Sequence, residues 1–439
     1  MRSLFLRLLK RPQLVFLFGA AILAASMWFY VDRILVSHQI ADAVAQGRPR
    51  GNLSDLYPRW LGARELLMHR RNPYGEDIAA EIQQGYYGRV LDPSRPNDPK
   101  DRQGFAYPVY VVFLLAPLIG LPFHVVQICF YWVLFGLMAA GVWLWLHALR
   151  WNVNAIGIAA VVLLTLGSFP VVQGIKLQQL SLVVAALLAA AAASVASGLL
   201  FCGGVLLALA TIKPQLAWPL VAWLLLWAVS EWRVRRSFVF GFGFAMALLL
   251  AGAEIVLPGW LPMFVAAIRQ YHRYTQNQSV LDQLVNWALG RFGGQILGWA
   301  AVFSCGVVLW PTRREPATAA SFGRATALVL ALTVLVVPMF APYNQVLLLP
   351  SLLLMARDGR ALTLRLRGGR VAYMACAFAL AWQWIATIGL TAAYWISPAW
   401  ALAGWTLPLL TTFALPVLVF ALTWMNVWSA QGRFARSQS

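Results

Sequence analysis

The chain has 439 residues, of which 61% are hydrophobic and only 11% are charged. Soluble domains are about one quarter charged, so this composition excludes an ordinary soluble protein and indicates a chain that crosses a membrane many times. The net charge of +19 does not indicate nucleic-acid binding, because the basic residues are scattered between apolar runs and form no continuous stripe. We expect one integral membrane domain over residues 1–439, with arginines that meet membrane lipid head groups.

Apolar runs long enough to cross a bilayer, roughly 20 residues each, define the predicted fold class as an all-α polytopic membrane protein. The first run is expected to be a retained anchor, because it is too long and lacks the small-residue site of a cleavable signal peptide. Twelve spans are predicted, near 13–36, 123–148, 155–172, 177–197, 198–212, 214–230, 238–257, 295–310, 317–339, 343–356, 371–395 and 400–426.

Arginines between the spans predict the orientation, because short cytoplasmic loops retain positive charge. With twelve spans and both termini in the cytoplasm, every short basic segment faces the cytoplasm. The segment Tyr107–Pro122, which prolines interrupt, is either a further span or a half-buried segment. Counting it as a span would turn every later loop to the other side. The arginines concerned are Arg233, Arg235, Arg236, Arg313, Arg314, Arg357, Arg360, Arg365, Arg367, Arg370, Arg433 and Arg436.

Polar segments on the opposite, extracytoplasmic side are the expected place for a site. They are the loop 37–104, the gaps around Lys176 and Lys213, the second large loop 258–294 and the break at 341–345. Ionisable residues are nearly absent inside the spans, whereas an ion-coupled transporter keeps some near mid-membrane. The spans are therefore interpreted as a scaffold and lipid groove.

Eight of the fifteen acidic residues lie in the loop 37–104 between Asp55 and Asp101. Apolar residues at helical spacing predict an amphipathic interfacial helix over 56–68, opened by Ser54 or Asp55, with arginines on its polar face. Two roles are open for Asp55. It is either the N-cap of this helix, paired with Arg59 one turn later, or a catalytic carboxylate.

Two of the four lysines lie in very short extracytoplasmic gaps and share the pattern Ile-Lys-x-Gln, with Lys176 and Gln178 in one copy and Lys213 and Gln215 in the other. An ammonium group beside glutamine amides suits a phosphate near the head-group plane. The alternative is that each lysine reaches from a helix end to water and lipid phosphate.

The loop 258–294 carries an amphipathic stretch over 260–274. Cations with amide and hydroxyl donors suit the recognition of phosphate and sugar. The alternative is an interfacial helix whose basic face meets lipid head groups. The candidate residues here are Arg269, His272, Arg273, Asn277 and Gln278.

Motifs for soluble cofactors are absent from the sequence. It has no Walker glycine loop, dinucleotide fingerprint, His-Glu-x-x-His helix or Gly-x-Ser-x-Gly elbow. No Asp-x-Asp pair is present, and the isolated cysteines do not have the spacing of a metal cluster. We therefore expect neither a metal nor a cofactor, and any activated donor has to be membrane-borne.

Six segments occur in an order and spacing that are typical of one family: Asp55–Trp60, Asn72–Tyr74, Tyr107-Pro108, 173–181, 210–215 and 277–279. Together they resemble glycosyltransferase family 87, over residues 13 to about 356. The members of this family are GT-C-type membrane enzymes that use polyprenyl-phosphate sugars and include bacterial α-(1→2) mannosyltransferases. The resemblance implies a bundle of about 12 transmembrane helices in a bacterial cytoplasmic (inner) membrane, with an extracytoplasmic active site for cell-envelope glycan synthesis.

By this resemblance, Asp55 is the catalytic base of an inverting transfer of a hexose, expected to be mannose, to a lipid-linked (glycolipid) or glycan acceptor. The donor is a polyprenyl-monophosphate sugar, whose phosphate the cations of the loops bind. Tyr107, Tyr343 and Asn344 complete the expected substrate-binding residues. A transporter or flippase of a lipid-linked sugar, or a non-catalytic membrane scaffold, are the alternative functions.

Overall fold

We analysed a computed structural model, which describes residues 12–51, 54–275, 278–290, 292–338, 340–365 and 368–437. Every regular element in these ranges is a helix, as the sequence predicts. In chain order the elements are α2 (Pro12–Phe29), η1 (Tyr30–Leu35), α3 (Val36–Ala45), α4 (Tyr57–His69), α5 (Glu76–Tyr87), α6 (Val111–Leu115), η2 (Ala116–Leu118), α7 (Phe123–Ala148), α8 (Ala155–Leu166), α9 (Phe169–Lys176), α10 (Leu180–Ala196), α11 (Leu200–Leu209), η3 (Ala210–Ile212), α12 (Pro214–Ser230), α13 (Trp232–Val256), α14 (Trp260–Thr275), α15 (Val280–Leu289), α16 (Gly293–Leu309), η4 (Trp310–Arg314), α17 (Ala320–Val336), η5 (Pro342–Leu348), α18 (Leu349–Arg365), α19 (Gly369–Ile396), α20 (Pro398–Ala403), η6 (Leu407–Leu409) and α21 (Ala414–Ser437).

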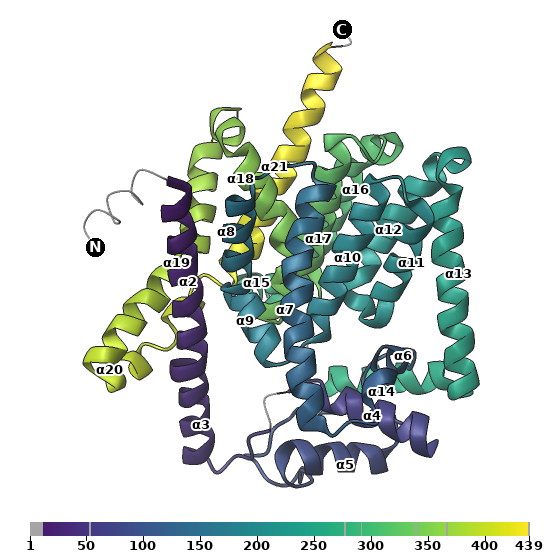
Figure 1. Cartoon of the computed structure of the whole chain (residues 1–439), viewed down its shortest axis with the longest axis vertical. Coiled ribbons are helices and arrows are strands. Elements are labelled where there is room, and N and C mark those ends of the chain that lie inside the picture. Colours follow the sequence, from purple (N-terminus) through teal and green to yellow (C-terminus); the bar gives the residue numbers. More distant parts are fainter. Residues whose placement is uncertain are drawn as a thin grey trace.

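The long helices run side by side between two ends of the molecule (Figure 1). One end holds the start of α2, the α12–α13 and α16–α17 connections and the end of α21. We call it the basic end, because these connections carry the predicted loop arginines. At the opposite end, the loop end, α4, α5 and α14 lie across the ends of the long helices, and α3 continues the line of α2 toward this end. The long polar loop and the amphipathic helix after α13 therefore gather at the same end.

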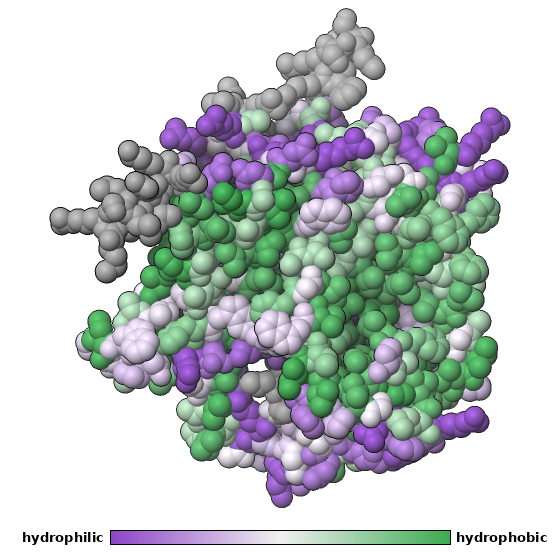
Figure 2. Space-filling model, in the orientation of Figure 1, coloured by the Kyte–Doolittle hydropathy of each residue, from purple (hydrophilic) through white to green (hydrophobic). Residues whose placement is uncertain are grey.

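Among the described residues, six helices are long and apolar enough to cross a membrane, and the bent pair α8–α9 is a seventh candidate. Four shorter apolar helices, α10, α11 with η3, α12 and α17, lie among them. A count of twelve is reached only if α18 is added to these eleven. Figure 2 shows an apolar surface between hydrophilic surfaces at the two ends, as expected for a protein that meets lipid along its sides. The chain is an integral membrane protein.

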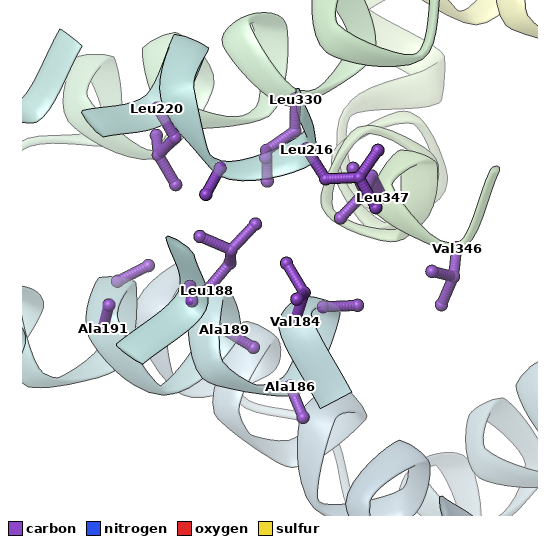
Figure 3. Packing of buried hydrophobic residues seen from close by; sticks show 14 of the residues in the cluster. Val184, Ala186, Leu188, Ala189, Ala191, Leu216, Leu220, Leu330, Val346 and Leu347 are labelled. Carbon is purple, nitrogen blue, oxygen red and sulfur yellow. The ribbon is translucent and has the colours of Figure 1, made fainter. Parts of the chain in front are cut away.

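The centre of the bundle is formed by α10 and α17, which are buried on nearly all faces. Figure 3 shows α10, α12, α17 and η5 meeting there, with Val184, Leu216 and Leu330 among the packed side chains. Nearby, α11 and α13 cross closely at two glycines. A Cβ on Gly204 would lie 2.2 Å from the carbonyl oxygen of Phe238, so only glycine permits this approach. Close packing of small residues stabilises helix pairs that burial from water cannot drive together in lipid.

The segment Tyr107–Pro122 contains only the short helices α6 and η2. Because a helix that crosses a membrane needs roughly 20 residues, this segment is not a span. It packs under α4, where the indole of Trp60 donates a hydrogen bond of 3.2 Å to the carbonyl of Leu118. The hydroxyl of Tyr110 donates to the carbonyl of Thr211, 3.0 Å away, at the end of η3. We call residues 54–122, which include α4, α5 and α6, the loop layer. These two hydrogen bonds attach the loop layer to itself through α4 and to the ends of the long helices through η3.

At the basic end, Arg235 departs from its predicted place on a cytoplasmic surface, because it is buried. Its guanidinium lies over the indole ring of Trp227, 4.0 Å from the ring centroid. It also donates to the backbone carbonyls of Trp227, Arg313, Arg314 and Glu315 at 2.7–2.9 Å. The arginine thus clamps the α12–α13 connection to η4.

Candidate active site

A cavity of about 180 Å³ lies at the loop end, between the loop layer and the ends of the long helices. Three walls enclose it, each named here for the part of the fold that forms it. The bundle wall contains Gln179, Ile212, Lys213, Pro214, Gln215, Pro338 and Tyr343; the loop wall contains Asp55, Arg59, Asp101, Gln103, Gly104, Ala106, Tyr107 and Pro108; the α14 wall contains Phe264, Ile268, Tyr271 and His272.

Asp55 lies directly before α4, and its backbone attaches it to the bundle. Its N–H donates to the carbonyl of Leu177, 2.8 Å away, in the turn between α9 and α10. Its carboxylate accepts hydrogen bonds from the side-chain amide of Gln179 and, at 3.3 Å, from the hydroxyl of Tyr86. The N-cap of α4 is Leu56, with no side-chain cap, so the predicted capping role of Asp55 is not observed.

Gln179 connects the carboxylate to a cation, and sequence reasoning did not select it. Its Nε2 donates to Asp55, while its Oε1 accepts a 3.4 Å hydrogen bond from the ammonium of Lys213. The predicted neighbour, Gln178, has a left-handed backbone with φ of 53°. Its side chain accepts from Ser54 and donates to the carbonyl of Gln127, so it holds the turn together and does not line the cavity.

Lys213 is buried in the bundle wall, with only 4% of its surface exposed. Its ammonium donates to the hydroxyl of Ser181 at 2.6 Å, and Ser181 donates in turn to Asn344. It lies 5.1 Å from the ring centroid of Tyr343. Asn344 therefore contacts Lys213 only through Ser181 and does not itself line the cavity.

Lys176 lies elsewhere. Its ammonium forms a 2.5 Å ion pair with Asp32 of η1 and is 5.8 Å from the ring centroid of Trp28. Neither Lys176 nor its partners line the cavity. The structure thus brings only one of the two Ile-Lys-x-Gln lysines to Asp55.

Arg59 and Asp101 are two further charged groups of the cavity that the sequence did not assign to the site. The Nη1 of Arg59 donates to the backbone carbonyl of Asp55 at 2.7 Å, and the guanidinium lies 4.7 Å from the ring centroid of Tyr107. The Nε of Arg59 is buried and has no hydrogen-bond partner among the described residues. The carboxylates of Asp55 and Asp101 both interact electrostatically with Arg59. The two carboxylates thus face two cations in the cavity, Arg59 and Lys213.

Burial raises the pKa of Asp55. The charges of Arg59 and Lys213 oppose this change, as do the hydrogen bonds from Tyr86 and Gln179. Desolvation disfavours the charged form of Asp55 and makes its carboxylate the stronger base. Burial also raises the pKa of Asp101.

The α14 wall contributes His272, as predicted, and Tyr271, which was not predicted. Arg269 and Arg273 are exposed and do not line the cavity, because they lie on other faces of the helix. Gln278 is exposed, and its carbonyl accepts a 3.0 Å hydrogen bond from Phe340.

Of the other predicted residues, Tyr107, Gln215 and Tyr343 line the cavity, and Asn277 lies outside the described residues. In the part of the chain that the structure describes, no three His, Cys, Asp or Glu side chains gather as a metal site.

The fold and the cavity together define an integral membrane protein with a charged pocket where its helices end. The model of glycosyltransferase family 87 matches residues 105–338, which is more than half of the chain. The chain therefore belongs to glycosyltransferase family 87 and is a membrane glycosyltransferase. No curated protein and no solved structure gives a significant match. The matched range contains Gln179, Lys213 and the α14 wall, whereas Asp55 and Asp101 precede it.

Proposed function

We propose that the protein transfers a hexose from a polyprenyl-monophosphate donor to a glycan or lipid-linked acceptor, by a single inverting displacement on the extracytoplasmic face. Mannose is the expected sugar, from the sequence resemblance to a family that includes mannosyltransferases. One observation carries the proposal: a half-buried carboxylate, Asp55, is connected through Gln179 to a buried ammonium, Lys213, inside one cavity where the apolar helices end.

In the proposed reaction, a hydroxyl oxygen of the acceptor attacks the anomeric carbon of the donor sugar. A new C–O bond forms as the bond between that carbon and the phosphate oxygen breaks, and the electron pair of the broken bond leaves with the polyprenyl phosphate. Asp55 accepts the proton of the attacking hydroxyl. Lys213 and Arg59 stabilise the negative charge that develops on the phosphate. The raised pKa of Asp55 favours this proton transfer.

The donor's tail is proposed to lie among the long helices, with its phosphate at the level of the cavity. The bent pair α8–α9, the shorter apolar helices and α18 would then complete twelve spans in a bacterial cytoplasmic membrane. In this arrangement the arginines of the basic end face the cytoplasm with both termini, as the positive-inside rule requires.

The test uses the purified full-length protein, a synthetic polyprenyl-phosphate mannose and a panel of mannosides. Wild-type protein is expected to form a disaccharide linkage, and Asp55→Asn to lower kcat about 10²- to 10⁴-fold, the usual contribution of a general base. Full activity in Asp55→Asn would refute the assignment of the base. Absence of transfer from any polyprenyl-phosphate hexose by the wild-type protein would refute the proposed function.

A further inference from the structure

The proposed reaction leaves one half-buried carboxylate of the cavity, that of Asp101, without a role. Asp101 lies on the loop wall, and both of its carboxylate oxygens accept hydrogen bonds from Gln103, at 2.9 Å from the backbone and 3.1 Å from the side chain. The hydroxyl of Tyr87 fixes the backbone by donating to the carbonyl of Asp101 at 2.8 Å. The side chain is thus held rigidly at the cavity surface.

A second hollow lies next to the cavity, on the side of residues 102–106. It is a shallow cleft of about 40 Å³ between α5 and α14, and it shares Gly104 and Ala106 with the cavity. Polar side chains line it, including Glu76, Arg102 and Gln270. Apart from the adjoining residues of the chain, no atom of the described residues lies within 4 Å of the position that a Cβ on Gly104 would occupy, so the surface over this glycine is open.

The charges differ between the two sides of the cavity. The bundle wall carries a cation, Lys213, and no carboxylate, whereas both carboxylates, Asp55 and Asp101, lie on the loop wall together with Arg59. In the proposed reaction the donor phosphate lies at Lys213, on the bundle side. An inverting displacement needs the acceptor on the side of the sugar opposite the leaving phosphate. The acceptor therefore approaches along the loop wall, where Asp101 is the second carboxylate that it meets.

We propose that Asp101 binds hydroxyl groups of a saccharide acceptor, and that the rest of this acceptor extends over Gly104 into the cleft between α5 and α14. A fixed carboxylate accepts charge-assisted hydrogen bonds from sugar hydroxyls, which are stronger than neutral ones. This inference rests on the proposed glycosyl transfer. It specifies the acceptor as a glycan of at least two sugars.

The first test is Asp101→Asn, compared with Asp92→Asn. Both aspartates accept a hydrogen bond from the backbone N–H two residues later, at 2.9 Å, and asparagine can keep that turn. Asp92 lines neither hollow. With synthetic polyprenyl-phosphate mannose and α-linked mannotriose, Asp101→Asn is expected to raise the KM for mannotriose about tenfold. The KM for the donor stays within twofold, and Asp92→Asn changes neither.

The second test is Gly104→Leu, compared with Gly120→Leu, at a glycine that is equally open but lies outside both hollows. Leucine at position 104 is expected to raise the KM for mannotriose at least tenfold and the KM for methyl mannoside much less. Gly104→Ala adds only one methyl group and should give a smaller increase.

The outcomes separate the two proposals. If wild-type protein transfers mannose and both variants retain the wild-type KM for mannotriose, the acceptor site at Asp101 is refuted while the glycosyl transfer stands. A rise in the donor KM that equals the rise in the acceptor KM would also refute it. If wild-type protein transfers nothing from any polyprenyl-phosphate hexose, the proposed function is refuted and this inference with it.

Discussion

Two segments of this chain share the pattern Ile-Lys-x-Gln, yet their lysines lie in different surroundings. Lys213 is 4% exposed and lies in the cavity wall, connected to Asp55 through Gln179. The side chain of Lys176 is 28% exposed and pairs with Asp32 on a separate helix. An identical local pattern therefore does not decide whether a cation belongs to a site, because the surrounding elements supply its partners.

The backbone explains why the two lysines diverge. Lys176 ends α9, which is bent by 61° from α8, and this places it against η1. Lys213 stands between η3 and α12, where Pro214 begins the next helix. The loop layer lies over this second junction. Lys213 is therefore buried, and its positive charge lies in surroundings of low polarity. Such a charge interacts more strongly than one in water.

The largest difference between the segments is expected from Lys213→Met. We predict a fall in kcat of about 10²- to 10³-fold, because this ammonium faces developing phosphate charge. Lys213→Arg should recover part of the loss, since it restores the charge with a different shape. The measurement is the steady-state rate of mannose transfer, with the melting temperature as the control for folding. A Lys213→Met variant that melts like the wild-type protein and keeps its full rate would contradict the role of the lysine.

A smaller effect is expected on the pH dependence of kcat/KM, and it should differ between variants of the two adjacent glutamines, Gln178 and Gln179. The base must be ionised, so kcat/KM should fall as the pH drops through the pKa of Asp55, which burial has raised above the usual value near 3.9. Gln179→Leu removes a hydrogen bond that favours the ionised form, so the acid limb should move to higher pH.

Gln178→Leu is the matched control for this experiment. Its side chain binds Ser54 and the carbonyl of Gln127, so the substitution should lower the melting temperature and leave the acid limb in place. If both leucine variants shift the pH profile equally, the connection through Gln179 is not the cause.

The smallest effect is expected from Lys176→Met. An ion pair this exposed contributes about 0–1 kcal/mol to stability, and the lysine lies outside the cavity. The transfer rate should stay within about twofold of wild type. A loss comparable to that of Lys213→Met would show that the two segments act together after all.

Much of the fold could be predicted, because long apolar runs and arginine-rich loops are direct consequences of the bilayer. The sequence also predicts a helix over 56–68, and the structure has one at Tyr57–His69; the predicted amphipathic character is weak, because Gly62 and Glu65 are buried with the apolar residues. Its apolar residues repeat with helical spacing, and Leu56, Trp60 and Ala63 are buried as expected. Local periodicity carries this information without any tertiary contact.

The cavity was predictable only in part. Asp55 and Lys213 stood out, as a candidate base and as one of very few lysines, and the structure brings them together. Arg59 was placed on a polar helix face, but the loop layer turns that face toward the bundle. Asp101 is one of eight acids between Asp55 and Asp101, and its location depends on the path of the chain between α5 and α6, which has no regular element to predict. Gln179 differs from Gln178 only through the left-handed φ at Gln178, which the sequence does not reveal.

The most direct test of the central claim is a structure of the full-length Asp55→Asn protein with polyprenyl-phosphate mannose bound. We predict that the phosphate lies within hydrogen-bonding distance of Lys213, and that the anomeric carbon faces the side chain at position 55. A donor phosphate bound at Lys176 and Asp32, with the cavity beneath the loop layer empty, would contradict the account.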